Sequence, residues 1–227
     1  WNDSLREGGK VLAVETDKAM DAISADVDWC FYIQGDEVVH EQYLPAILEA
    51  MTKYKADPEV EGLLFKYEHF FGSYEYLGDS PGWYRREVRI VRKDAAIRSY
   101  KDAQGFRKNG QKLRVKLIDA YVYHYGWVKN PAFQVEKAKS FHKYWHNDQW
   151  IESRIPEIEL FDYSEVDSLK LFSGSHPKVM QKRIDLQNWK FKFDIHKKKL
   201  PLKHKLKIAI ERLTGWRIGE YKNYKKI

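Results

Sequence analysis

The chain has 227 residues, of which 43% are hydrophobic and 15% aromatic; this is enough apolar material for a packed core and argues against general disorder. Its single cysteine excludes an intrachain disulfide and a cysteine-rich zinc site, and favours a reducing compartment. The net charge of +7 suits a partner such as nucleic acid, anionic lipid or a phosphorylated substrate.

The first half of the chain is predicted to alternate strands and helices. Residues 10–15 are predicted as a short strand, and residues 17–25 as a helix. Residues 28–34 are nearly all apolar, which is typical of a parallel strand covered on both faces. An amphipathic helix over 41–57 and a strand over 60–71 follow. This order predicts an α/β sheet with right-handed crossovers, whose ligands lie at the carboxyl ends of the strands.

The second half is predicted to hold two further strands and then helices. Residues 86–93 mix charged and apolar side chains as in a half-exposed strand, and residues 112–127 form a second such segment. A helical pattern returns at 131–148. A boundary near residue 150 would divide a catalytic domain, 1–150, from a helical, basic extension, 151–227.

The strand over 28–34 runs into the acidic sequence Gln34-Gly35-Asp36-Glu37. Adjacent carboxylates suit Mg²⁺ or Mn²⁺, which take oxygen ligands and bridge to substrate phosphates. The alternative is that Asp36 caps a following helix, with Glu37 near its positive end. The residues alone leave both interpretations open.

The segment DWCFYIQGDE resembles the strand and metal motif of family 2 glycosyltransferases with the GT-A fold. In that family the strand ends in an Asp-x-Asp-Glu pattern and holds a nucleotide-sugar diphosphate through a metal ion. The segment ETDKAMDAI resembles the preceding, donor-side segment. The resemblance covers roughly Trp1 to Trp127 and is greatest to bacterial members that modify cell-surface glycans. It implies a GT-A-like, Rossmann-type mixed sheet with flanking helices, with an N-terminal strand-helix unit that is missing ahead of Trp1.

The resemblance also implies roles for single residues. Asp36 would be the principal metal ligand, Glu37 the trailing acid of the motif and Asp17 a donor-side polar group. Gln34 stands where the family has its first Asp, and its neutral amide would coordinate more weakly. His124 is similar to a late histidine that supplies a further metal ligand; the alternative is a hydrogen-bonded histidine within an aromatic cluster. A shared metal would require the Asp36 carboxylate and the His124 imidazole to lie within roughly 5 Å.

Sugar transfer also needs a base for the acceptor and a partner for the diphosphate. Asp102, in the loop 99–107, is the first candidate for the base, and Asp79 is the second; each could equally be an ordinary loop residue. Arg89 could contact the diphosphate, because guanidinium groups suit phosphate oxygens. The alternative is that Arg89 belongs to a partly solvated, charged strand.

These observations favour a metal-dependent enzyme. It would move a sugar from a nucleotide-sugar donor to a glycan or lipid-linked hydroxyl, in the cytoplasm, with Mn²⁺ or Mg²⁺ as cofactor and no nucleic acid as partner. Two other hypotheses stay open: a basic nucleic-acid-binding module, and a degenerate GT-A-like protein that binds glycans without turnover.

A basic amphipathic helix is predicted over 202–216. Leu202, Leu206, Ile210 and Leu213 recur at helical spacing, several lysines supply charge, and Trp216 follows Gly215. Such a helix can lie on the anionic inner face of a membrane. It can also pack its apolar stripe against the catalytic domain.

Overall fold

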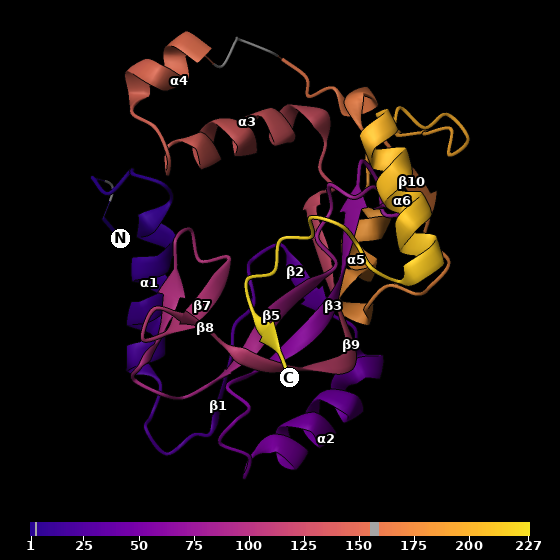
Figure 1. Cartoon of the computed structure of the whole chain (residues 1–227). Coiled ribbons are helices and arrows are strands. Elements are labelled where there is room, and N and C mark those ends of the chain that lie inside the picture. Colours follow the sequence, from indigo (N-terminus) through magenta and orange to yellow (C-terminus); the bar gives the residue numbers. More distant parts are fainter. Residues whose placement is uncertain (3, 155–158) are drawn as a thin grey trace.

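The computed structural model describes residues 1–2, 4–154 and 159–227. Its centre is a curled mixed sheet in which five strands lie side by side in the order β2, β9, β3, β5, β1 (Figure 1). Their bounds are β1 (Trp29–Phe31), β2 (Glu37–Val39), β3 (Gly62–Phe71), β5 (Arg86–Arg92) and β9 (Arg114–Trp127). Of these pairs only β3 and β9 are parallel.

Shorter strands extend this sheet or form a small second one. β4 (Tyr76–Gly78) pairs with the end of β3 and with β10 (Leu169–Leu171), whereas β11 (Lys225–Lys226) pairs with the start of β9. The second sheet consists of β6 (Ile97–Tyr100), β7 (Gly105–Lys108) and β8 (Gln111–Lys112).

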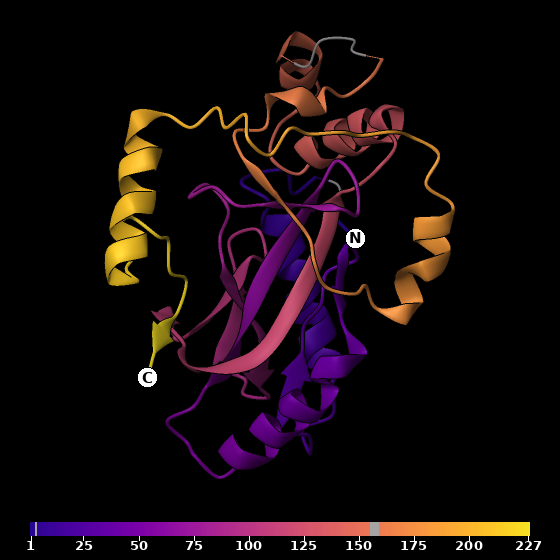
Figure 2. The same cartoon turned by 90° about the vertical axis from the view of Figure 1, so that its right-hand side faces the viewer.

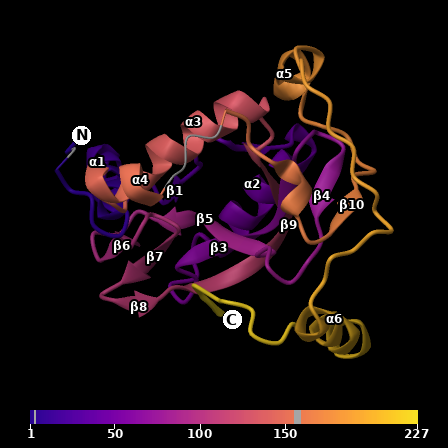
Figure 3. The same cartoon turned by 90° about the horizontal axis from the view of Figure 1, so that it is seen from above.

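Helices flank the central sheet. They are α1 (Lys10–Ala22), α2 (Leu44–Tyr54), α3 (Pro131–His142), α4 (Asp148–Arg154), α5 (Gln181–Asp185) and α6 (Leu202–Thr214), with 3₁₀ turns at Glu41–Tyr43, Tyr163–Glu165 and Lys178–Met180. α1 lies beside the small sheet, and α3 crosses above the central one (Figures 1 and 3). α5 and α6 lie on opposite sides of the molecule (Figure 2). The predicted class, a mixed α/β fold with flanking helices, is therefore confirmed.

The core is built around β3, whose residues Leu63, Leu64 and Phe65 are fully buried. Leu64 belongs to an apolar cluster that includes Met20 of α1, while Leu63 and Phe65 pack in a second cluster with Ile47 of α2. Successive strand residues point to opposite faces, so β3 supplies both clusters. The predicted strand over 60–71 and the helix at 41–57 are thus confirmed in their main parts.

The prediction of a strand at 10–15 is wrong, because these residues open the single helix α1. A run of four apolar residues does not by itself distinguish a strand from a buried helix segment. Contacts at helical spacing fix the outcome: Lys18 Nζ lies 2.8 Å from Glu15 Oε1, and the Thr16 hydroxyl donates to the Leu12 carbonyl at 2.8 Å. Asp17 therefore lies inside a helix rather than at its start.

The prediction of a central parallel strand at 28–34 is also wrong. β1 has only three residues, lies at the end of the strand order and runs antiparallel to β5. Phe31 and Ile33 are exposed as a result. A continuous apolar segment indicates that its side chains are hydrophobic, but it does not determine which strand it pairs with.

The C-terminal segment 151–227 is interwoven with the sheet through β10 and β11. Leu169, Tyr163 and Val166 pack in one cluster with Phe71 of β3. The alternative in which the apolar stripe of 202–216 packs against the domain holds at most for Ile210, which is half-buried, because Leu202, Leu206 and Leu213 of α6 are 85%, 64% and 85% exposed. Within the described residues, none of the helices has the length and apolar character needed to cross a membrane.

Candidate functional site

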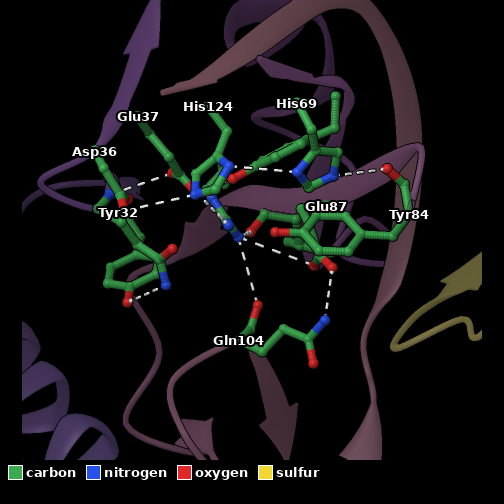
Figure 4. A network of polar contacts seen from close by, with 12 residues as sticks. Tyr32, Asp36, Glu37, His69, Tyr84, Glu87, Gln104 and His124 are labelled. Carbon is green, nitrogen blue, oxygen red and sulfur yellow. Dashed lines mark hydrogen bonds and ion pairs between the residues drawn. The ribbon is translucent and has the colours of Figure 1, made fainter. Parts of the chain in front are cut away.

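A row of polar side chains crosses one face of the central sheet, from β2 over β9 and β3 to β5 (Figure 4). Strand register creates the row, because Glu37 of β2 and His69 of β3 both lie opposite His124 of β9. Residues directly opposite one another in paired strands share a face of the sheet. The register thus brings together polar residues of β2, β3 and β9, which are far apart in the sequence.

Glu37 is the buried counter-ion of Arg89. Its carboxylate accepts hydrogen bonds from Arg89 Nε at 2.8 Å and Nη2 at 2.6 Å, from the Tyr67 hydroxyl, and from the Gln34 backbone N–H at 3.2 Å. Both oxygens are therefore used inside the protein. Glu37 is therefore not available as a metal ligand.

Arg89 is likewise committed to the interior, since only 1% of it is exposed. Burial disfavours its charge, but Glu37 outweighs this and keeps the pKa of Arg89 above its ordinary range. The predicted strand at 86–93 is confirmed as β5, but its predicted half-exposure is wrong, because residues 87–91 are all buried, Glu87 and Arg89 included. The Arg89 guanidinium is not accessible to a diphosphate, so Arg89 is not part of the proposed donor site.

Glu87 is a second acid beside Arg89. Its Oε1 accepts from the Gln104 side-chain amide at 3.2 Å, while its Oε2 is buried without a hydrogen-bond partner, 3.9 Å from Arg89 Nη1. Burial raises the pKa of Glu87 to about 7, although Arg89 acts in the opposite direction. One arginine thus neutralises Glu37 fully and Glu87 only in part.

Asp36 directly precedes β2 and is held by a backbone hydrogen bond, in which the Tyr125 N–H donates to the Asp36 carbonyl at 2.8 Å. The residues after it form a strand, so the helix-capping interpretation of Asp36 is wrong. Its Oδ2 lies 3.5 Å from His124 Nε2 and accepts from Lys137 Nζ at 2.9 Å. Burial opposes the charge, yet His124 and Lys137 hold the pKa of Asp36 below its usual range. The predicted proximity of Asp36 and His124 is confirmed.

The hydrogen bonds of His69 fix the orientation of His124. Burial and the neighbouring His124 lower the pKa of His69 to about 3, so His69 is neutral and carries one ring N–H. That proton is on Nε2, which lies 3.0 Å from the Tyr84 carbonyl, an acceptor only. Nδ1 of His69 then accepts from Nδ1–H of His124 at 3.3 Å. The other ring nitrogen of His124, Nε2, faces Asp36.

Gly126 packs directly against the Asp36–His124 pair. A Cβ added to Gly126 would lie 2.5 Å from His124 Nε2 and 2.6 Å from Asp36 Oδ2. Both distances are too short for non-bonded atoms, so any side chain at this position would displace one or both groups. The absence of a side chain therefore lets the carboxylate and the imidazole lie where they do.

The pair therefore has the features of a partial cation site. A carboxylate oxygen and an imidazole nitrogen suit Mn²⁺, and a metal-binding histidine commonly donates its other N–H to a neighbouring acceptor, as His124 does to His69. Among the described residues, however, no group of three or more His, Cys, Asp or Glu side chains could hold a metal. A cation here would complete its coordination with water or phosphate oxygens. It would also compete with the ammonium of Lys137 for Asp36.

The remaining predicted residues are not brought to this pair; among the described residues, no hydrogen bond or ion pair links Asp17, Asp79 or Asp102 to Asp36. Asp17 accepts from the Ser99 N–H at 2.7 Å and joins α1 to β6. Asp102 lies in the turn between β6 and β7, next to Gly9. Gln34 donates from its side chain to the Tyr32 hydroxyl at 3.3 Å.

Asp79 lines a cavity of about 320 Å³ at the end of β3, and Asp36 and His124 are not among the residues that line it. One Asp79 oxygen pairs with Lys198 at 2.7 Å, and the other is buried without a hydrogen-bond partner. His69 lines the cavity as well as contacting His124. The cavity and the candidate cation site thus share one residue.

The other strand arginines are bound internally, which weakens the nucleic-acid hypothesis. Arg85 pairs with Glu211 and Glu220 at 2.5 and 3.0 Å. Arg92 donates to four backbone carbonyls around the end of α2. A phosphate backbone requires cations that are free to replace its counterions.

No family model matches this chain, and no match is found among the curated proteins. The site must therefore be judged from its own geometry. Sequence reasoning missed three of its residues: His69, Gly126 and Lys137. A histidine inside an apolar strand was the only available signal for His69, and nothing in the sequence indicates that Lys137 of α3 reaches Asp36.

Proposed function

We propose that this chain is a metal-dependent glycosyltransferase with a GT-A-like fold. It would act in the cytoplasm and move a sugar from a nucleotide-sugar donor to a glycan or lipid-linked hydroxyl. One observation carries the proposal: an ionised Asp36 and an oriented His124 face each other at 3.5 Å, with Gly126 packed against both. The resemblance of the segment around Asp36 to the metal motif of family 2 glycosyltransferases supports it further.

In this proposal Asp36 and His124 hold a divalent cation, which when bound neutralises charge on the departing diphosphate. Lys137 lies beside Asp36, where its ammonium is close enough to pair with a phosphate oxygen once the carboxylate binds the cation. Asp102 and Asp79 remain the proposed bases for the acceptor hydroxyl. The cavity that Asp79 lines is also lined by His69, which contacts His124, and this favours Asp79 over Asp102.

Calorimetric titration tests the cation site directly. UDP and GDP are titrated into the full chain with Mn²⁺ or with EDTA, and we expect binding of one of them that requires Mn²⁺. Asp36→Asn and His124→Gln should each abolish it, whereas Glu75→Gln, a change at an exposed acid, should not. Equal affinity in all four proteins would contradict the proposal. A panel of nucleotide sugars, with and without EDTA, then tests turnover.

A glycan-binding protein without turnover is the second candidate. It is favoured by Gln34 in place of the first acid and by the burial of Glu37, which together leave two protein ligands for a cation. Glycan binding that persists in EDTA, with no consumption of any nucleotide sugar, would select this function.

A further inference from the structure

The three leucines of α6 are exposed, whereas Ile208 and Ile210 are half-buried. At about 100° per residue, Leu202, Leu206 and Leu213 fall within an arc of about 40°, and each is more than half exposed. Trp216, just beyond the helix end at Gly215, is 58% exposed. A helix that serves only the protein core places such a stripe inward.

The opposite face of α6 is attached to the rest of the chain. Glu211 accepts from Arg85 at 2.5 Å and from Arg217 at 2.7 Å, and Arg217 also donates to the Trp83 carbonyl at 3.1 Å. Arg85 in turn pairs with Glu220 beyond the helix. These contacts fix the rotation of α6, so that its leucines are held outward.

Positive charges lie on both sides of the leucine stripe. By the same helical geometry, Lys203 lies on one side and Lys205 and Arg212 lie on the other, and all three are exposed. The one acidic residue of α6 is Glu211, which the inward contacts occupy. The outward face is therefore apolar in the middle, basic at both edges and free of acid.

We propose that α6 lies on an anionic phospholipid surface, with its leucines and Trp216 in the interface and its basic residues among the headgroups. The 13 residues of α6 extend about 20 Å, which suits a helix lying in the plane of the interface. Charge complementarity selects this partner, because a second copy would bring two basic faces together. The inference stands on α6 alone and does not depend on the proposed transferase activity.

Vesicle flotation of the full chain tests it. Vesicles of phosphatidylcholine alone are compared with vesicles that also contain phosphatidylglycerol, at low and high salt. We expect flotation with the anionic vesicles only, and loss of it at high salt. Replacement of Lys203, Lys205 and Arg212 by Gln should weaken partitioning on the order of 100-fold. Replacement of Leu202, Leu206 and Leu213 by Gln should abolish it.

Two matched variants serve as controls. One replaces the exposed apolar residues Leu171, Val179 and Leu186 by Gln, and the other replaces the exposed lysines Lys53, Lys101 and Lys112 by Gln. Both should float like the unaltered chain, and circular dichroism should show all variants folded. Failure of the unaltered chain to bind anionic vesicles would overturn the proposal, as would unchanged binding by the leucine variant. Self-association that the leucine variant loses, without vesicle binding, would assign the face to a second copy instead.

Discussion

A carboxylate and an imidazole 3.5 Å apart can form an internal ion pair or hold a cation. Only the second use binds a metal ion, so Mn²⁺ affinity distinguishes the two. Gly126 packs against both groups, so its replacement should displace them and remove such a site.

Gly126→Ala should abolish Mn²⁺ binding, because the new Cβ would lie against both His124 Nε2 and Asp36 Oδ2. Electron paramagnetic resonance of free Mn²⁺ measures the effect. Gly35→Ala is the matched control, since a Cβ there meets no atom within 4 Å. Mn²⁺ affinity that is the same in both variants would show that the pair is only an internal contact. Thermal unfolding should confirm that Gly126→Ala remains folded.

His69→Phe should weaken Mn²⁺ affinity about 10- to 100-fold, the usual effect of removing a partner of a metal-binding histidine. An aromatic ring is kept, but the acceptor for His124 Nδ1–H is lost. Tyr67→Phe is the control, because the Tyr67 hydroxyl bonds to Glu37 rather than to His124. If Tyr67→Phe lowers Mn²⁺ affinity as strongly as His69→Phe, His69 acts through general packing.

Some of this site could be predicted from the sequence and some could not. The proximity of Asp36 and His124 was predictable, since acids that follow an apolar strand lie at a sheet end and the resemblance pointed to a late histidine. The burial of Glu37 was not predictable, because it depends on Arg89 and Tyr67, which lie more than 20 residues away in the chain. Ion pairs across strands follow from register, which single-strand patterns do not specify.

At the scale of elements, length decides which predictions succeed. β3 with 10 residues and β9 with 14 have patterns long enough to identify, and both were predicted. β1 and β2 have three residues each, and their pairing with β5 and β9 is set by tertiary contacts. The existence of the two long strands was therefore predictable, whereas the order of the strands was not.

Arg92 of β5 holds the end of α2, and its replacement should show how much this contact contributes to the free energy of unfolding. Its guanidinium donates to the carbonyls of Tyr54 and Lys55 at the end of α2, and to those of Asp57 and Val60 beyond it. Arg92→Ala leaves these acceptors without their charged donor, and we expect the free energy of unfolding to fall by about 2–4 kcal/mol. Urea denaturation measures this. Arg98→Ala, which breaks the exposed pair with Asp21, should cost at most about 1 kcal/mol. Equal effects of the two changes would contradict the assigned role of Arg92.

At the scale of the whole molecule, the positive excess is arranged unevenly. The arginines of the sheet are paired with acids or carbonyls inside the fold, whereas the outward face of α6 keeps exposed cations. Burying acids beside a limited number of arginines also makes overall stability depend on pH. Glu87 is such an acid, because its Oε2 is buried without a hydrogen-bond partner.

Stability should fall as the pH rises from about 5 to about 7, and Glu87 should cause much of the fall. Its pKa is about 7 in the folded chain against an ordinary value of 4.5. Between these values the folded state keeps a proton that the unfolded state has released, so unfolding becomes easier as the pH rises, by at most about 1.4 kcal/mol per pH unit. Glu87→Gln removes the titrating group, and its stability should exceed that of the unaltered chain increasingly across this range.

Urea denaturation at several pH values between about 5 and 8 measures the difference. Below this range the lowered pKa of Asp36 acts in the opposite direction, because its protonation destabilises the fold. Glu75→Gln, at an exposed acid, should follow the unaltered chain at every pH. Parallel curves for the unaltered chain and Glu87→Gln would mean that Arg89 neutralises Glu87 as fully as it does Glu37. Divergence toward high pH would establish Glu87 as the buried acid that is left without a full counter-ion.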